Sequence, residues 1–142
     1  MQKNGEEVCM RIPGVLKLVL LVEDEPGSAE ALRAVLETAG FRVATASNGR
    51  AALDLLAGEK PAVILADYSL PGVSGAELGR AVRADPRLAD VPFVMVSGFG
   101  QAAVRDVFDD YDTFLGKPLS PEVVVPLIAH LSRYGRPTSK TL

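Results

Sequence analysis

Residues 63–75 read VILADYSLPGVSG, and this stretch carries an apolar run directly into a carboxylate. The run ends at Asp67, and Pro71, Gly72 and Gly75 then interrupt any regular element. A short, continuous apolar run is typical of a strand that is covered on both faces, as in a parallel sheet. The stretch therefore predicts a buried strand over 62–66 that places Asp67 at its carboxyl end.

The rest of the chain alternates short apolar runs with segments of helical periodicity. Further strands are predicted over 16–22, 41–46, 91–96 and 112–115. A helix is predicted after each strand, and the residues that mark their ends are Gly40, Asn48, Gly58, the Ser74–Glu77 capping box, Ser120 and Pro121. Five strand–helix pairs predict an α/β fold, a three-layer sandwich with helices on both faces of a parallel sheet.

Length and composition favour a single domain. The chain has 142 residues, of which 48% are hydrophobic, and this suits one core of ordinary size. We expect the domain over 15–133, between flexible ends at 1–14 and 134–142.

The net charge is −3 and the basic residues are scattered, which argues against nucleic acid as a partner. No membrane span or signal peptide is recognisable, so no membrane partner and a cytoplasmic location are expected. The single cysteine, Cys9, cannot form an internal disulfide.

Polar side chains follow four of the five predicted strands. Any one of them is ordinary for a loop, but the carboxyl ends of parallel strands meet at one edge of the sheet, where ligands bind. Carboxylates gathered there raise one another's pKa unless a cation lies among them, and oxygen ligands favour Mg²⁺. A lysine beside the metal suits a phosphate-like anion. The residues concerned are Glu23, Asp24, Glu25, Asp67, Ser97 and Lys117.

Four motifs resemble those of the response-regulator receiver domain of two-component signalling, a chemotaxis-regulator-like domain. They are LVLLVEDEP (18–26), VILADYSLPGVSG (63–75), FVMVSG (93–98) and FLGKP (114–118). They occur in the order of the family, each at a predicted strand end, and the resemblance covers about residues 16–131. It implies a flavodoxin-like fold with five helices and a five-stranded parallel sheet of order 2-1-3-4-5.

The resemblance also implies a role for each polar residue. Asp67 matches the phosphoacceptor. Mg²⁺, with Mn²⁺ as a substitute, would be bound by Asp24 and Asp67, by Glu23 through water, and by the backbone carbonyl of Ser69. Lys117 would contact the phosphoryl group, and the family often has a cis peptide between this lysine and the following proline. Glu25 is interpreted as a solvated loop charge.

Ser97 and Phe114 match the two switch positions of the family. The resemblance implies that Ser97 donates to a phosphoryl oxygen after transfer and that the aromatic side chain then turns inward. Phe114 is equally well interpreted as a plain core residue, because it lacks a hydroxyl that would favour an outward position.

The segment after Ser97 departs from the common pattern. PFVMVSGFG (92–100) resembles a less common receiver subgroup whose fourth strand ends in Thr-Gly and a glycine-rich turn. Gly98 and Gly100 weaken the start of the following helix, so a helix at about 101–108 is expected to be short or frayed. Our hypothesis is that 98–108 is mobile without phosphate, and that Phe99 shields an acyl phosphate from water.

The leading interpretation is a stand-alone receiver that accepts a phosphoryl group from a histidine kinase or a phosphotransfer protein. It would catalyse only its own phosphorylation and dephosphorylation, signal through contact with an unidentified protein, and exist as a monomer or a weak phosphorylation-dependent dimer. A receiver excised from a longer protein fits the short ends equally well. Two alternatives remain open: a Mg²⁺-dependent phosphohydrolase, which would need a second carboxylate where Ser69 stands, and a degenerate receiver that acts as a binding module.

Overall fold

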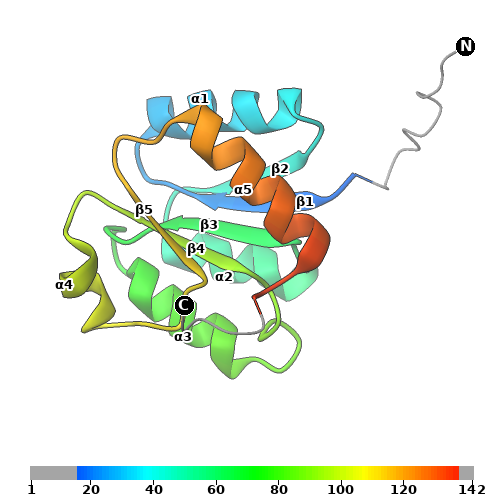
Figure 1. The fold of residues 1–142 in the computed structure, drawn as a ribbon. Helices are drawn as coiled ribbons and strands as arrows, with labels where there is room; N and C mark the ends of the chain where they lie inside the picture. Colours follow the sequence, from blue (N-terminus) through cyan, green and yellow to red (C-terminus); the bar gives the residue numbers. More distant parts are fainter. Residues whose placement is uncertain (1–15, 138–142) are drawn as a thin grey trace, which may run out of the picture.

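The computed structural model describes residues 16–137 and contains a five-stranded parallel sheet of order β2-β1-β3-β4-β5 between two layers of helices (Figure 1). The strands are β1 (Leu18–Val22), β2 (Arg42–Ala46), β3 (Val63–Asp67), β4 (Phe93–Ser97) and β5 (Thr113–Gly116). The helices are α1 (Pro26–Thr38), α2 (Gly49–Gly58), α3 (Gly75–Ala84), α4 (Gln101–Arg105) and α5 (Pro121–Tyr134). The predicted fold class and strand order are confirmed. Cys9 and the predicted N-terminal extension at 1–14 lie outside the described residues.

The core has two parts, one on each face of the sheet. Every residue of β1, β3 and β4 is buried, which explains why their sequences are continuously apolar rather than alternating. On one face, α1 and α5 cover side chains such as Val19 and Leu65, and on the other, α2, α3 and α4 cover side chains such as Leu20 and Ile64. None of the helices among residues 16–137 is both long and apolar enough to cross a membrane.

Most helix ends lie where the sequence predicts them. Asn48 caps α2 by accepting a hydrogen bond from the amide of Ala51, and Ser74 and Glu77 form the predicted capping box at the start of α3. Glu25 is a correction, because it is more than a solvated loop charge. Its side chain accepts a hydrogen bond of 2.6 Å from the amide of Ser28 and so caps α1.

Helix α4 is short, as predicted. It has five residues and ends at Arg105, although the sequence pattern extended to about 108. Its N-cap residue, Gly100, has no side chain to bond the free amides of the first turn. The helix is therefore a weak element, and the buried side chain of Val104 packs it against the core.

A buried ion-pair network lies at the amino-terminal edge of the sheet and was not predicted. The side chain of Asp112 is fully buried and accepts hydrogen bonds from Arg83 (2.9 Å), Arg136 (2.8 Å) and the amide of Phe93 (2.8 Å). Arg136 also bonds Asp110 at 2.8 Å. The predicted boundary of the C-terminal tail at 134 is therefore too early, because α5 includes Tyr134 and Arg136 is held in the fold. The rest of that predicted tail, 138–142, is not described.

Candidate functional site

The predicted site residues are brought together at the carboxyl edge of the sheet. Glu23 and Asp24 directly follow β1, Asp67 is the last residue of β3, Ser97 is the last of β4, and Lys117 directly follows β5. Strands β1 and β3 are neighbours although β2 lies between them in the sequence. Their ends form the topological switch point, where open α/β sheets bind ligands.

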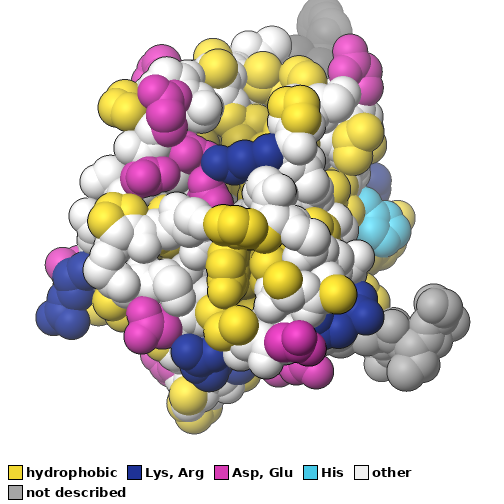
Figure 2. Space-filling view, turned by 90° about the vertical axis from the view of Figure 1, so that its left-hand side faces the viewer, with side chains coloured by type: hydrophobic (Ala, Val, Ile, Leu, Met, Phe, Trp, Pro, Cys, Tyr) yellow, Lys and Arg dark blue, Asp and Glu magenta, His cyan; other side chains and the backbone are white. Residues whose placement is uncertain are grey.

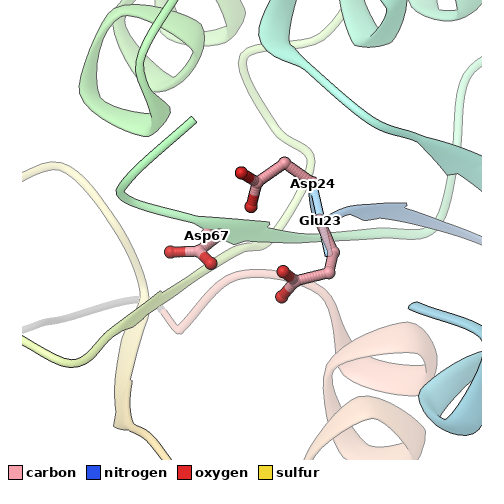
Figure 3. Close-up of side chains that lie close together, drawn as sticks. All are labelled: Glu23, Asp24 and Asp67. Carbon is pink, nitrogen blue, oxygen red and sulfur yellow. The ribbon is translucent and has the colours of Figure 1, made fainter. Parts of the chain in front are cut away.

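Three carboxylates converge at this point. One oxygen each from Glu23, Asp24 and Asp67 lie within 4.8 Å of one another, and Figure 3 shows the three side chains around a common space at the ends of β1 and β3. Asp67 is only 4% exposed and the side chain of Glu23 only 10%, whereas Asp24 is exposed. Two of the three charges are thus removed from water, and a cation is needed to balance them.

Lys117 supplies one such cation. Its ammonium group lies 2.5 Å from Asp67 Oδ2 and 3.6 Å from Glu23 Oε1. Partial burial opposes its charge, but the hydrogen bond and charge of Asp67, with the charge of Glu23, raise the pKa of Lys117 above its ordinary value. The peptide bond between Lys117 and Pro118 is cis, as the family resemblance implied. Figure 2, which faces the left-hand side of Figure 1, shows a basic side chain next to a group of acidic ones.

The lysine does not balance the carboxylates fully. Burial raises the pKa of Glu23 above its ordinary value; the amide of Glu25 opposes the shift, and the charge of Asp67 adds to it. The attraction of Lys117 is too weak to reverse this direction. The cluster therefore still favours a further positive charge, either a proton or a metal ion.

The break after Asp67 has a clear structural basis. The amide of Ser69 donates to Asp67 Oδ1 at 3.1 Å, which fixes the carboxylate from the loop side. Gly72 has a φ of 70°, in the left-handed region that favours glycine. A Cβ on Gly75 would lie 2.4 Å from the carbonyl oxygen of Asp67, so only glycine lets α3 begin so close to the strand end. Whether the Ser69 carbonyl binds a metal stays a prediction.

Ser97 is buried beside this cluster, and its hydroxyl oxygen is engaged as a hydrogen-bond acceptor. It is 1% exposed and accepts a hydrogen bond of 2.8 Å from the amide of Phe99. The ring of Phe99 is 60% exposed and contacts Tyr68 edge-to-face, with 6.1 Å between ring centroids. The ring of Phe99 thus contacts the residue that directly follows Asp67. Its role in shielding an acyl phosphate from water stays a prediction.

Phe114 is half-buried against the core and pairs with Met95 across the sheet. Its ring centroid lies 6.0 Å from that of Tyr111. Both earlier interpretations, switch and core residue, fit this position. Sequence reasoning missed Tyr111 because it lies in a loop before β5. Its only sequence signal was an aromatic residue three positions before Phe114.

Comparisons with known proteins agree with this geometry. The family described as "Response regulator receiver domain" matches residues 19–129. The phosphate regulon transcriptional regulatory protein PhoB of Pseudomonas aeruginosa is 35% identical over 84% of this chain and 53% of its own length. An uncharacterized 14.6 kDa protein of Leptolyngbya boryana is 34% identical over 78% of this chain and 86% of its own. The chain thus spans about half the length of PhoB and most of the smaller protein.

Solved structures show the same fold. The receiver domain of a signal transduction histidine kinase from Syntrophus aciditrophicus superposes with a TM-score of 0.77 and 28% identity, and covers 82% of this chain and 90% of its own. The receiver domain of the sensor histidine kinase PA1611 from Pseudomonas aeruginosa superposes with a TM-score of 0.78 over 84% of this chain and 99% of its own. At 23% identity that likeness shows the fold alone, and that structure has a magnesium ion in its active-site cleft. By its sequence match, its fold and its cluster of acids with a lysine, the chain belongs to the response regulator receiver family of two-component signalling.

Proposed function

We propose that this receiver accepts a phosphoryl group on Asp67 from a phosphohistidine of a histidine kinase or a phosphotransfer protein. One observation carries the proposal: Lys117 contacts the buried carboxylate of Asp67, and two further acidic side chains lie beside it. In the transfer, an oxygen of the Asp67 carboxylate forms a bond to phosphorus and the phosphorus–nitrogen bond breaks. The imidazole nitrogen keeps the bonding electron pair, so the product is an acyl phosphate.

The acidic cluster fits a divalent metal by its donor chemistry. All three groups are carboxylates within reach of one another, and no residue of a softer ligand type belongs to the cluster. Such oxygen ligands favour Mg²⁺, with Mn²⁺ as a substitute. Glu23, Asp24 and Asp67 would hold the ion together with the carbonyl of Ser69. When bound, the ion offsets the negative charge that phosphoryl transfer brings into the site.

Lys117 and Ser97 would contact the phosphoryl group once it is on Asp67. The ammonium group of Lys117 already touches Asp67 and would form a charge-assisted hydrogen bond to a phosphoryl oxygen. The Ser97 hydroxyl accepts from the amide of Phe99 and keeps its own proton free to donate to a phosphoryl oxygen. Turning the side chain toward the phosphate would give up the bond from Phe99. This exchange of partners at Ser97, with inward movement of Phe114, is the proposed switch.

Labelling with acetyl phosphate and Mg²⁺ tests the acceptor, with intact-mass spectrometry as the readout. The wild-type chain should gain one phosphoryl group, and Asp67→Asn should gain none. Asp54→Asn is the matched control, because Asp54 is an exposed carboxylate paired with Arg50 on α2. Labelling that survives Asp67→Asn, or that Asp54→Asn also abolishes, would contradict the assignment.

The output of this receiver is proposed to be contact with another protein, from a monomer or a weak phosphorylation-dependent dimer in the cytoplasm. Beryllofluoride mimics the phosphoryl group, so a pull-down with the beryllofluoride-activated chain should capture partners that Asp67→Asn does not. The alternative of a phosphohydrolase is disfavoured by Ser69, which offers no second carboxylate. Steady turnover of a small phosphate ester would restore it. The degenerate-receiver alternative predicts no Mg²⁺-dependent change in stability.

A further inference from the structure

A row of aromatic side chains connects the segment after α4 with β5. The ring centroids of Phe93 and Phe108 lie 5.9 Å apart, those of Phe108 and Tyr111 6.3 Å, and those of Tyr111 and Phe114 6.0 Å. Tyr111 is 5% exposed and lies in the middle of this row. Phe114 has no hydroxyl. Its neighbour in the row, Tyr111, has one and can therefore form a directional hydrogen bond.

The hydroxyl of Tyr111 accepts a hydrogen bond of 3.1 Å from the side-chain amide of Gln101. Gln101 is the first residue of α4, the short helix that has no side-chain cap. Neither Gly98 nor Gly100 meets another atom within 4 Å at the position of a Cβ, and neither has a positive φ. The space around both glycines is thus open, and the bond from Gln101 to Tyr111 ties the first residue of α4 to the loop before β5.

Gln101 lies four residues along the chain from Ser97, the residue that turns in the proposed function. The hydroxyl of Ser97 is bonded to the amide of Phe99, and Gln101 follows Phe99 by two residues. If Ser97 turns to a phosphoryl group, Phe99 loses its partner and the chain up to Gln101 is displaced. A tether at Gln101 opposes that displacement.

We propose that Tyr111 is a positioning residue that sets how easily the Ser97 segment rearranges, by holding the first residue of α4 through Gln101. The inference rests on the proposed phosphorylation of Asp67. In the arrangement described, Lys117 contacts Asp67 directly and Ser97 bonds Phe99. The bond between Tyr111 and Gln101 stabilises this arrangement and thus slows conversion to the phosphorylated form.

The test compares Tyr111→Phe with the wild-type chain. The variant keeps the ring and its aromatic contacts and loses only the hydroxyl. We expect phosphorylation by acetyl phosphate to become about two- to tenfold faster, the change in population that one neutral hydrogen bond supports. Amide exchange over 101–108 should rise by a similar factor without phosphorylation. Tyr134→Phe is the matched control, because Tyr134 is 68% exposed on α5.

Gln101→Leu removes the other partner of the same bond and makes the test specific. It should also accelerate labelling, and the effects of the two substitutions should not add in the double variant, because both remove the same bond. A tyrosine with only a structural role would lower the melting temperature without changing the rate.

The outcomes separate the inference from the proposed function. If the wild-type chain is labelled on Asp67 but Tyr111→Phe is labelled at the same rate, the inference is wrong and the acceptor stands. Additive effects of the two substitutions would also overturn it. If the wild-type chain is not labelled at all, both the proposed function and this inference fail.

Discussion

Replacing Lys117 with methionine tests the charge balance of the site most directly. The substitution keeps an unbranched apolar chain and removes the ammonium group 2.5 Å from Asp67 and 3.6 Å from Glu23. A hydrogen bond between charged groups contributes about 1.5–3 kcal/mol. The side chain of Lys117 is 38% exposed, so screening by water reduces its share, but Asp67 is left buried without a cation. We expect a loss of about 2 kcal/mol in the free energy of unfolding.

The loss should be measured by urea denaturation at pH 7 with EDTA, and then with Mg²⁺. The pKa of Lys117 is raised, so its stabilisation is complete at neutral pH and is lost as the pH rises from the ordinary 10.5 through that raised pKa. Added Mg²⁺ should stabilise the variant more than the wild-type chain, because the metal no longer competes with an ammonium group. Lys60→Met is the control, since Lys60 forms an exposed pair with Asp90 and should cost less than about 1 kcal/mol. Equal losses in the two variants would refute the reasoning.

Three further predictions concern Glu23 of the same cluster, the buried network around Asp112, and the glycines that flank the site. Folding favours protonated Glu23 because its pKa is raised. As the pH falls through that raised pKa, the wild-type chain without metal should therefore gain stability relative to Glu23→Gln. The gain should level off below pH 4.5, the ordinary pKa of the glutamate side chain. Parallel profiles of unfolding free energy against pH for the two chains, measured in urea, would contradict this. Asp112→Asn removes the buried charge that Arg83 and Arg136 share and leaves them Asp110 as a carboxylate partner. It should cost about 3 kcal/mol in urea denaturation, at the low end for a broken buried pair, whereas Asp90→Asn should cost little. Similar losses would show that the buried network contributes no more than a surface pair. Gly98→Ala should raise the free energy of unfolding by about 0.4–1 kcal/mol and slow amide exchange over 98–108, because a Cβ meets no atom there and φ is not positive. The same change at Gly72, with its φ of 70°, should destabilise the chain. Unchanged exchange in Gly98→Ala would count against a mobile segment.

The fold was predictable because its signals are local. Each strand lies within two residues of its predicted limits, since runs such as 63–66 are apolar throughout only where helices cover both faces. The proximity of Asp67 to Glu23 and Lys117 followed from one rule, that the carboxyl ends of parallel strands meet. That rule requires the strand order but no knowledge of side-chain packing.

The features that sequence reasoning missed depend on contacts between distant segments or on uncommon local choices. Asp112 is buried because Arg83 and Arg136, 29 and 24 residues away, both reach it. No periodic pattern encodes such a network. Glu25 caps α1 although Ser, Thr, Asp and Asn are the usual capping residues, so its sequence context did not signal a cap. The bond between Gln101 and Tyr111 likewise depends on where a short helix begins.

The position of Arg136 has a practical consequence. Its guanidinium group bonds Asp112, just before β5, and the carbonyl of Ala89, before β4. The chain therefore leaves the domain at the edge of the sheet opposite Asp67. An affinity tag, a dye or a sensor-chip tether fused after residue 137 would be attached at that far edge, where it leaves the acidic cluster accessible. Binding measurements on immobilised receiver can thus be made with the acidic cluster facing the solution.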